Sequence, residues 1–385
     1  MFFKFIQRGF NPLLNKLKAY GGCLRFSKVV LSQLEKIWAQ IRQGVFDRGE
    51  KMAEKYKVII TDYDFGNIDV ETNVLKDALG DAVEVVGLNA KSEEELIGPA
   101  KDADALIVQY SHVGRRIIEE MQQGKIIARY GSGVDIVDVE AASECGIMVT
   151  NVPDYCHQEV ADHAVTLLLT LIKKIKIYDQ KVRTGEWRWQ SAKPIYRMQG
   201  KSVGIVGFGR IGMEIAKRVQ GFGIKPLVYT PRMTAERARE HQVESVSFET
   251  LLRESDYIIL QAPLTQETKH LLSDREFAMM KDQVILVNTA RGPMVDEAAL
   301  IRALESGKVA GAGLDDIEEE PAKRRNWKPD SKLFDFENVI VTPHAAYYSE
   351  ESIIESRQRA AEEVARVLKG EAPHHLVNQA AIHSK

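Results

Sequence analysis

From Lys57 onward, short runs of apolar and mostly β-branched residues alternate with longer amphipathic stretches. Apolar runs without polar alternation are typical of strands that are buried on both faces of a parallel sheet. The first series of predicted strands is Val58–Thr61, Val83–Val86, Ala105–Val108, Ile126–Arg129 and Met148–Thr150, and the second is Ser202–Val206, Pro226–Tyr229, Asp256–Leu260, Val284–Val287, Gly311–Leu314 and Val339–Val341. Strands that alternate with helices in this way predict an α/β protein with two doubly wound parallel-sheet domains.

One long helical stretch separates the two strand series. It runs from His157 to Thr184 and is rich in Val, Leu and Ile. Further helices are predicted at Val70–Leu79, Ser92–Ile97, Ile211–Gln220 and near Ser349–Lys369, and the charged segment Glu318–Lys332 predicts a loop. The longest mainly apolar stretch, Ala164–Ile172, covers nine residues. A membrane span needs about 20, so no membrane partner is expected.

The first 51 residues differ in charge from the rest. They hold ten Lys or Arg and three Asp or Glu, a local charge of +7. Apolar residues at helical spacing between Val30 and Ile41 predict a short basic amphipathic helix. Residues 1–51 are therefore interpreted as a basic extension with several alternatives. It is a surface-binding helix, an organelle presequence, a partner-binding segment or a disordered stretch, or it results from a mis-called start and the native protein begins at Met52.

Composition narrows the class of protein. A chain of 385 residues suits two domains. Lys plus Arg number 52 against 55 Asp plus Glu, and this near balance argues against nucleic-acid binding. The three cysteines, Cys23, Cys145 and Cys156, form no CxxC pair, and no His cluster has metal-ligand spacing. We therefore expect no metal site, and a reducing compartment such as the cytoplasm.

A G-x-G-x-x-G motif, formed by Gly207, Gly209 and Gly212, lies between an apolar strand and a helix. The first glycine allows a tight turn, the second lets the backbone approach a pyrophosphate, and the third lets helix pack on strand. Arg210 and Ile211 open the helix, whose N-terminal N–H groups and dipole favour phosphate. The motif predicts a dinucleotide-binding domain, with NAD or NADP as cofactor.

The end of the next strand bears on the choice between NAD and NADP. An acidic residue there would bond the ribose hydroxyls of NAD, but this chain has Thr230, followed by Arg232. A carboxylate would repel a 2′-phosphate, whereas threonine with a nearby arginine can accept one. Arg232 could equally be a solvated loop residue. The pattern favours NADP.

Five motifs resemble those of the D-isomer-specific 2-hydroxyacid dehydrogenase family, and the resemblance covers about Lys57 to Gly370. The motifs are Tyr130–Asp135, Gly146–Pro153, Val287–Asp296, Ala312–Pro321 and Val341–Glu350. The His-Ala-Ala-Tyr-Tyr-Ser run within the last one is most similar to the branch of the C-terminal-binding-protein corepressors and their bacterial relatives.

The resemblance implies a Rossmann-type NAD(P)-binding domain at 153–344, inserted into a flavodoxin-like substrate domain at 52–152 that is completed by about 345–375. It implies an oxidoreductase that transfers a hydride between NAD(P)H and a small 2-keto acid to give a D-2-hydroxy acid. It also implies a homodimer joined through the cofactor domain and its long helix, and the apolar stretch Ala164–Ile172 fits such burial. The alternative is a dinucleotide-sensing binding protein of corepressor type.

By the same resemblance, the catalytic residues are Arg291, Glu320 and His344. A planar guanidinium can bind and polarise the oxygens of a 2-keto acid, and an imidazole can protonate the nascent alkoxide. A neighbouring carboxylate stabilises the imidazolium, although the acidic run around Glu320 also fits a solvated loop. Ala290 and Asp315 match cofactor-binding positions, the aspartate holding the nicotinamide carboxamide.

The resemblance further implies that backbone N–H groups around Ser132, Gly133 and Val134 cradle the substrate carboxylate. Tyr110 lies in a loop where many relatives have an arginine, so a phosphorylated substrate is less expected. Tyr110 is either a pocket residue or an ordinary loop residue. Tyr347, close to the catalytic histidine, could narrow the pocket.

Overall fold

The computed structural model describes residues 55–318 and 328–378. The basic extension 1–51 and its predicted helix lie outside the described residues. Within the described part the chain forms two parallel sheets, one of five strands and one of seven. No helix of that part is long and apolar enough to cross a membrane.

The five-stranded sheet has the order β2-β1-β3-β4-β5. Helices α3 and α14 pack over one face, and α4, α5 and α6 cover the other. Helix α14 comes from the end of the chain and contacts both α3 and β4. The bounds are β1 Tyr56–Ile60, α3 Asp69–Leu79, β2 Val83–Gly87, α4 Glu93–Ala100, β3 Ala105–Val108, α5 Arg115–Glu120, β4 Ile126–Arg129, α6 Val139–Glu144, β5 Met148–Thr150 and α14 Glu350–Leu368.

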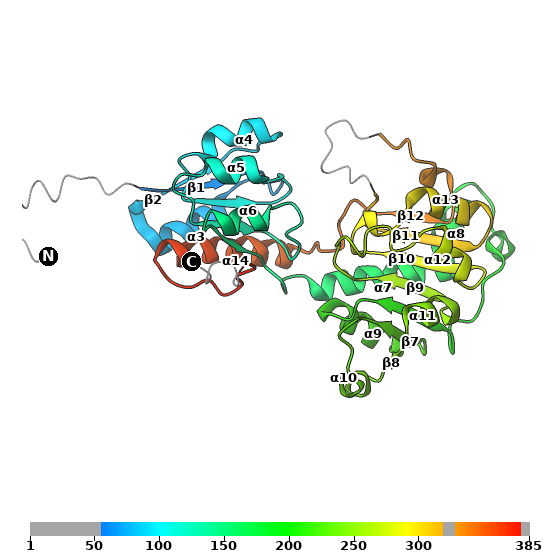
Figure 1. The fold of residues 1–385 in the computed structure, drawn as a ribbon. Coiled ribbons are helices and arrows are strands. Elements are labelled where there is room, and N and C mark those ends of the chain that lie inside the picture. Colours follow the sequence, from blue (N-terminus) through cyan, green and yellow to red (C-terminus); the bar gives the residue numbers. More distant parts are fainter. Residues whose placement is uncertain (1–54, 319–327, 379–385) are drawn as a thin grey trace, which may run out of the picture. The chain divides into compact units, whose positions relative to one another are not determined.

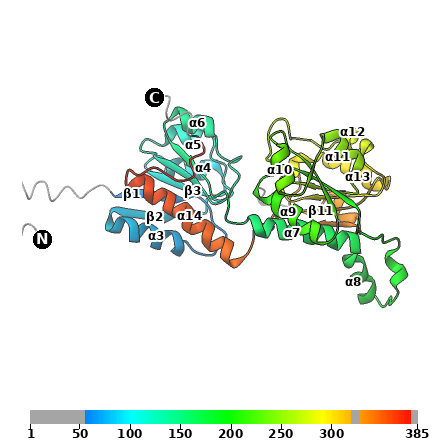
Figure 2. The same cartoon turned by 90° about the horizontal axis from the view of Figure 1, so that it is seen from below.

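The seven-stranded sheet has the order β12-β11-β10-β9-β6-β7-β8. Helices α7 and α9 pack over one face, and α11, α12 and α13 cover the other (Figures 1 and 2). The bounds are α7 His157–Lys173, α8 Ile175–Arg183, β6 Ser202–Val206, α9 Arg210–Gly221, β7 Lys225–Tyr229, α10 Ala235–Glu240, β8 Glu244–Ser245, α11 Phe248–Glu254, β9 Tyr257–Leu260, α12 Asp274–Met279, β10 Val284–Asn288, α13 Glu297–Glu305, β11 Val309–Leu314 and β12 Val339–Val341.

Every predicted strand is present, with its bounds shifted by at most two residues. Strand β8 was missed because it consists of two exposed residues and gives no apolar run. The helical stretch predicted from His157 to Thr184 is present, but it is divided into the two helices α7 and α8. Lys174 has a left-handed φ of 51° and separates α7 from α8, and its N–H bonds back to Thr170 and Leu171.

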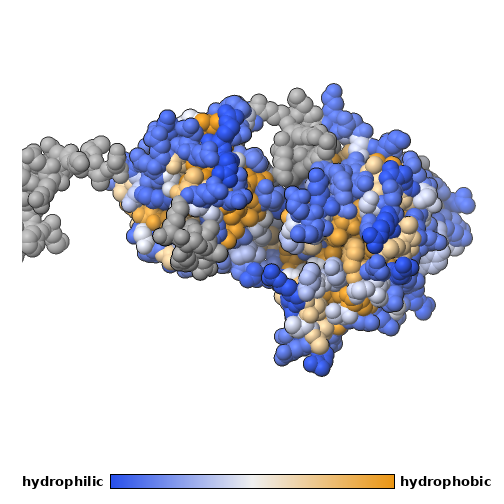
Figure 3. Space-filling view, in the orientation of Figure 1, coloured by the Kyte–Doolittle hydropathy of each residue, from blue (hydrophilic) through white to orange (hydrophobic). Residues whose placement is uncertain are grey.

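The apolar stretch Ala164–Ile172 is buried within the chain itself. It packs against β10 and β11, where Gly313 lets α7 approach so closely that an added Cβ would lie 3.0 Å from Leu167 Cβ. This burial within one chain accounts for the apolar residues of the stretch, and the dimer stays a prediction. Hydrophilic residues cover most of the face shown in Figure 3. In the segment from Ile175 to Tyr196 the exposed large apolar side chains are Ile175, Val182, Trp187, Trp189 and Tyr196.

Candidate active site

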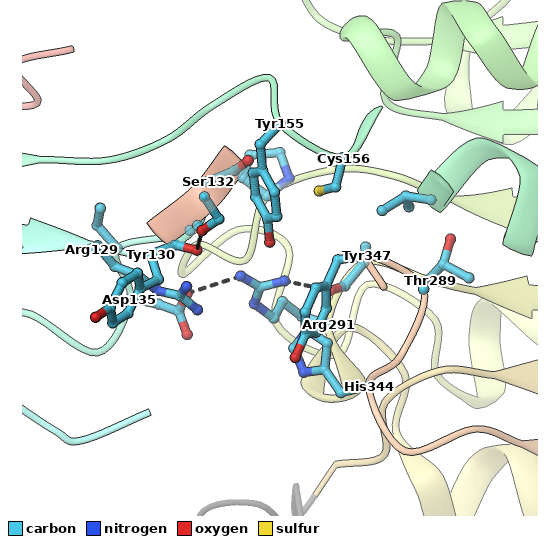
Figure 4. Close-up of a pocket in the computed structure, with 18 of the residues that line it drawn as sticks. Arg129, Tyr130, Ser132, Asp135, Tyr155, Cys156, Thr289, Arg291, His344 and Tyr347 are labelled. Carbon is cyan, nitrogen blue, oxygen red and sulfur yellow. Dashed lines mark hydrogen bonds and ion pairs between the residues drawn. The ribbon is translucent and has the colours of Figure 1, made fainter. Parts of the chain in front are cut away.

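A cavity of about 630 Å³ lies where the carboxyl ends of strands from both sheets meet their loops. Open α/β sheets bind ligands at such positions. The cavity brings together most of the predicted site residues, which come from six separate segments of the chain, and Figure 4 shows Ser132, Arg291 and His344 among the side chains around it. The predicted residues that line it are Tyr110, Ser132, Gly133, Val134, Ile211, Ala290, Arg291, Asp315 and His344.

The turn after β10 presents Arg291 to this cavity. The buried Asn288 side chain donates to the Arg291 carbonyl at 2.8 Å and accepts from the Ala290 N–H at 3.0 Å. The Gly292 N–H donates to Asp316 Oδ2 at 3.1 Å. A Cβ at Gly292 would lie 1.9 Å from the Ile317 carbonyl oxygen, so only glycine fits. These contacts fix the backbone on both sides of the arginine.

The Arg291 guanidinium reaches the loop after β4 and points toward Asp135 (Figure 4). Its Nη2 lies 3.3 Å from Asp135 Oδ1, and Nη1 donates to the Ala290 carbonyl. The loop leaves room for it at Gly133, where an added Cβ would lie 2.0 Å from Arg291 Nη2. The predicted carboxylate cradle and the predicted arginine are therefore adjacent.

His344 follows β12 and adopts a left-handed φ of 51°, which is uncommon for a residue with a side chain. Its N–H donates to the Asp315 carbonyl at 2.7 Å. The Asp315 side chain accepts from the next two N–H groups, those of Ala345 and Ala346, both at 2.9 Å. The imidazole is half-buried and lines the same cavity as Arg291.

The Asp315 carboxylate is thus already engaged by the protein. Besides the two N–H groups it accepts the Thr342 hydroxyl at 2.5 Å, and it is almost fully buried. It lines the cavity, as expected of a residue near the nicotinamide. Its contacts also give it a role that the sequence did not indicate, which is to hold the loop that carries His344.

Three tyrosines, Tyr110, Tyr155 and Tyr347, also line the cavity. The hydroxyls of Tyr110 and Tyr347 lie 3.0 Å apart, so Tyr110 is a pocket residue and not an ordinary loop residue. Burial, and then the neighbouring phenol, raises the pKa of Tyr110 above its ordinary value. Burial likewise raises the pKa of Tyr155, whose ring centroid lies 6.4 Å from that of Tyr347. These phenols stay neutral at physiological pH and can donate hydrogen bonds.

Sequence reasoning missed Arg129, the last residue of β4. Its side chain lines the cavity, and its Nε is buried without a hydrogen-bond partner among the described residues. Gly131 makes room for the guanidinium, because an added Cβ would lie 2.3 Å from Arg129 Nη1. A half-buried cation in a pocket wall favours an anionic ligand. The signal available in the sequence was a charged residue at the end of an otherwise apolar strand.

The glycine motif has the geometry that a dinucleotide needs. Gly207 has φ 98°, and an added Cβ would lie 2.4 Å from the Gln261 carbonyl oxygen. A Cβ at Gly212 would lie 2.4 Å from the Gly207 carbonyl oxygen, whereas one at Gly209 would meet nothing within 4 Å. Gly209 therefore leaves open space before the N-terminus of α9, and no side chain caps that helix. A pyrophosphate fits there.

The end of β7 carries the residues expected beside the adenosine. Thr230 is half-buried and Arg232 is exposed. A further cation, Arg237 on α10, was not predicted. Its guanidinium lies 5.3 Å from the Phe208 ring centre and donates to the Phe208 carbonyl within the glycine motif.

Glu320 lies outside the described residues. Its neighbour Glu318 is described, and it makes two contacts on the same side of the sheet. Its Oε1 lies 2.5 Å from His270 Nε2, and its Oε2 accepts from the Glu297 N–H at 3.2 Å. Glu318 is therefore tied to neighbouring loops.

Comparison with known proteins decides the family. The family model described as the NAD-binding domain of D-isomer-specific 2-hydroxyacid dehydrogenases matches residues 165–346. Glyoxylate reductase of Thermococcus litoralis is 42% identical over 295 residues, which cover 74% of this chain and 86% of that protein. The chain belongs to the D-2-hydroxyacid dehydrogenase family.

Solved structures of family members are similar throughout. A glyoxylate reductase from Paecilomyes thermophila matches with a TM-score of 0.75 and 28% identity, covering 86% of this chain and 100% of that one. D-lactate dehydrogenase of Aquifex aeolicus, complexed with NAD and lactic acid, matches with a TM-score of 0.74 and 28% identity, covering 85% of this chain and 98% of that one.

These findings confirm the family resemblance and the fold class of two parallel-sheet α/β domains. As a D-2-hydroxyacid dehydrogenase, the protein is an oxidoreductase that uses a nicotinamide dinucleotide to interconvert small 2-keto acids and D-2-hydroxy acids. The relatives named above are enzymes, so the corepressor-type alternative receives no support. The similarity to the corepressor branch stays a prediction.

Proposed function

We propose that this dehydrogenase reduces a small, unphosphorylated 2-keto acid, with glyoxylate as the first candidate, and that it uses NADPH. The observation that carries the proposal is that the Arg291 guanidinium and the His344 imidazole line one cavity beside a glycine turn suited to a pyrophosphate. The relatives named glyoxylate reductase support the choice of the first substrate.

Arg291 binds the carboxylate and carbonyl oxygens of the keto acid and polarises the carbonyl, because its fork of donors matches two oxygens. Backbone N–H groups of Ser132, Gly133 and Val134 cradle the same carboxylate. Arg129 adds positive charge to this wall of the cavity. A larger phosphorylated acid would need a further cation in the loop after β3, where this chain has Tyr110.

His344 donates the proton that the new alkoxide requires, and it accepts that proton in the reverse reaction. Glu320 is proposed to stabilise the imidazolium. The bound nicotinamide supplies the hydride that the carbonyl carbon receives. When the dinucleotide binds, the N–H groups of Arg210, Ile211 and Gly212 at the start of α9 would hold its pyrophosphate, and Ala290 and Asp315, which line the cavity, would hold its nicotinamide.

Three features support NADPH over NADH. Thr230 stands where a carboxylate would repel a 2′-phosphate. Arg232 is exposed at the same loop, and Arg237 lies against the glycine motif. Arginine forks bind phosphate well. The substitution Arg232→Ala should raise KM for NADPH about tenfold, the loss of one charged hydrogen bond, and leave KM for NADH unchanged.

We also propose a homodimer formed through the segment beyond Lys174, where α8 and the following loop expose apolar side chains. Trp187 is 85% exposed and Trp189 is 66% exposed, more than an isolated monomer is expected to show in one segment.

A reducing compartment such as the cytoplasm is consistent with Cys145 and Cys156, which are both free thiols.

The test follows the oxidation of NADPH and of NADH with glyoxylate, hydroxypyruvate, pyruvate and longer 2-keto acids. We expect NADPH and glyoxylate to give the highest kcat/KM. Arg291→Gln and His344→Gln should each abolish turnover while NADPH still binds, as followed by its fluorescence. Full activity of His344→Gln would overturn the proposed chemistry, and preference for NADH would overturn only the choice of cofactor.

A further inference from the structure

His163 makes a contact that the mechanism above does not use. It lies on α7, its side chain is 25% exposed, and its Nε2 lies 2.9 Å from the Thr342 hydroxyl. That hydroxyl is in turn 2.5 Å from Asp315 Oδ1. The three side chains form a line from the helix to the carboxylate that holds the His344 loop.

The protons of this line have one consistent arrangement. A carboxylate can only accept, so the single proton of the Thr342 hydroxyl goes to Asp315. The hydroxyl oxygen then accepts from His163, whose Nε2 must carry a proton. The His163 N–H therefore donates to the Thr342 hydroxyl oxygen, and the Thr342 O–H donates to the Asp315 carboxylate.

The final group of the line determines where the His344 side chain points. Asp315 accepts the N–H groups of Ala345 and Ala346, and its carbonyl accepts the N–H of His344. His344 has a left-handed φ of 51°. Such a conformation is strained in a residue with a side chain and persists only where its surroundings enforce it. The bonds to Asp315 are among the contacts that enforce it, together with the bond from the His344 N–H to the Thr342 carbonyl at 3.0 Å.

We propose that His163 is a positioning residue, which acts through Thr342 and Asp315 to hold the His344 imidazole in its catalytic orientation. This inference rests on the proposed role of His344. His163 lines no part of the cavity and is not proposed to touch substrate or cofactor. Its loss should therefore lower the rate of the proton-coupled step and leave binding intact.

The test separates positioning from folding by pairs of variants. His163→Leu and Thr342→Val break the line, whereas His163→Gln and Thr342→Ser keep a donor and a hydroxyl. We expect the first pair to lower kcat about 10- to 100-fold, as small misplacements of catalytic groups do. KM for NADPH should stay within about twofold, and the second pair should restore most of the rate.

The double variant His163→Leu/Thr342→Val should be no slower than Thr342→Val alone, because both substitutions break one line. His157→Leu removes the other histidine of α7, which bonds the Asp154 carbonyl, and should leave kcat unchanged. Unchanged kcat in His163→Leu, or additive losses in the double variant, would overturn the inference. If His344→Gln were fully active in the same assay, the proposed role of His344 would fail instead.

Discussion

Arg291 Nη2 lies 3.3 Å from the carboxylate of Asp135, so the guanidinium proposed to bind substrate is already paired with an acidic side chain. The two side chains are 22% and 30% exposed, so the pair is partly accessible to solvent. An incoming keto-acid carboxylate must compete with Asp135 for the same donors. The pair therefore sets how strongly the ligand-free site attracts an anion.

Asp135→Asn should lower KM for the 2-keto acid about 3- to 10-fold, because removing a partly exposed partner is worth about 1 kcal/mol. The effect should shrink as ionic strength rises, since salt screens the charge that is being removed. KM measured at low and high salt checks both points. Asp179→Asn, which removes an exposed charge on α8, is the matched control. A higher KM in Asp135→Asn would mean that Asp135 instead orients Arg291.

Gly133→Ala tests whether Arg291 needs the space above the loop after β4. The new methyl group would lie 2.0 Å from Arg291 Nη2 and 2.9 Å from Asp135 Oδ1, so the guanidinium must move. We expect kcat/KM to fall about 100-fold with an unchanged melting temperature. Gly98→Ala, where an added Cβ meets nothing within 4 Å, should keep normal kinetics. Normal kinetics in Gly133→Ala would contradict the placement of Arg291.

The strands could be predicted because a strand buried on both faces is apolar at successive positions, as Ala105–Val108 is. The glycine motif and Arg291 could be found because each sits in a contiguous run of sequence. The break at Lys174 could not, because a lysine with positive φ gives none of the signals that glycine, proline or asparagine would give. Its conformation depends on tertiary packing.

Contacts between distant residues were also beyond the sequence. Arg291 and Asp135 are 156 positions apart, and His163 and Thr342 are 179 apart. No local pattern pairs such residues, because the pairing follows from how strands and helices cross in space. Arg129 was missed for a related reason: only the fold shows that its side chain lines the cavity.

Removing one partner of a buried ion pair should strongly destabilise the five-stranded domain. Arg357 on α14 donates from Nε and Nη2 to the Glu71 carboxylate on α3, both at 2.8 Å, and Tyr130 donates to the same carboxylate. Both charged side chains are almost fully buried. Arg357→Met leaves the buried Glu71 carboxylate without its cationic partner. The free energy of unfolding should therefore fall by about 3–5 kcal/mol.

Urea unfolding measures the free energy of unfolding of this variant and of a control, Arg302→Gln. The control removes an exposed ion pair with Asp274, so its free energy of unfolding should fall by less than about 1 kcal/mol. Equal losses in the two variants would show that the buried pair contributes no more than a surface pair does.

Burial raises the pKa of the Cys156 thiol to about 12 from an ordinary value of 9.0. At pH 8 only about one thiol in ten thousand is then a thiolate, so iodoacetamide should leave Cys156 unmodified in the folded protein. The exposed Cys145 serves as the control within the same molecule. The pKa of Cys156 is higher in the folded chain than in the unfolded chain. The buried neutral thiol therefore stabilises the fold below pH 9, and this contribution is lost as the pH rises toward 12. Peptide mass mapping at pH 8 checks the labelling, which rapid modification of Cys156 would contradict.

Trp187 and Trp189 stand at the exposed end of the segment proposed to form the dimer. The segment has internal support, since Tyr178 donates to the Trp189 carbonyl at 2.7 Å and the Lys193 ammonium lies 4.6 Å from the Trp189 ring centre. A tryptophan at the centre of an interface contributes about 2 kcal/mol or more.

Replacing both tryptophans with serine should therefore raise the dimer dissociation constant about a thousandfold, since each 1.4 kcal/mol is tenfold. Light scattering after size exclusion at micromolar concentration should find a dimer for the unsubstituted chain and a monomer for the double variant. Phe222→Ser removes an exposed aromatic residue after α9 and should leave the dimer intact. If the double variant is still a dimer, the interface lies outside this segment. Among its described residues, only Tyr196 exposes an aromatic side chain to a degree comparable with the two tryptophans.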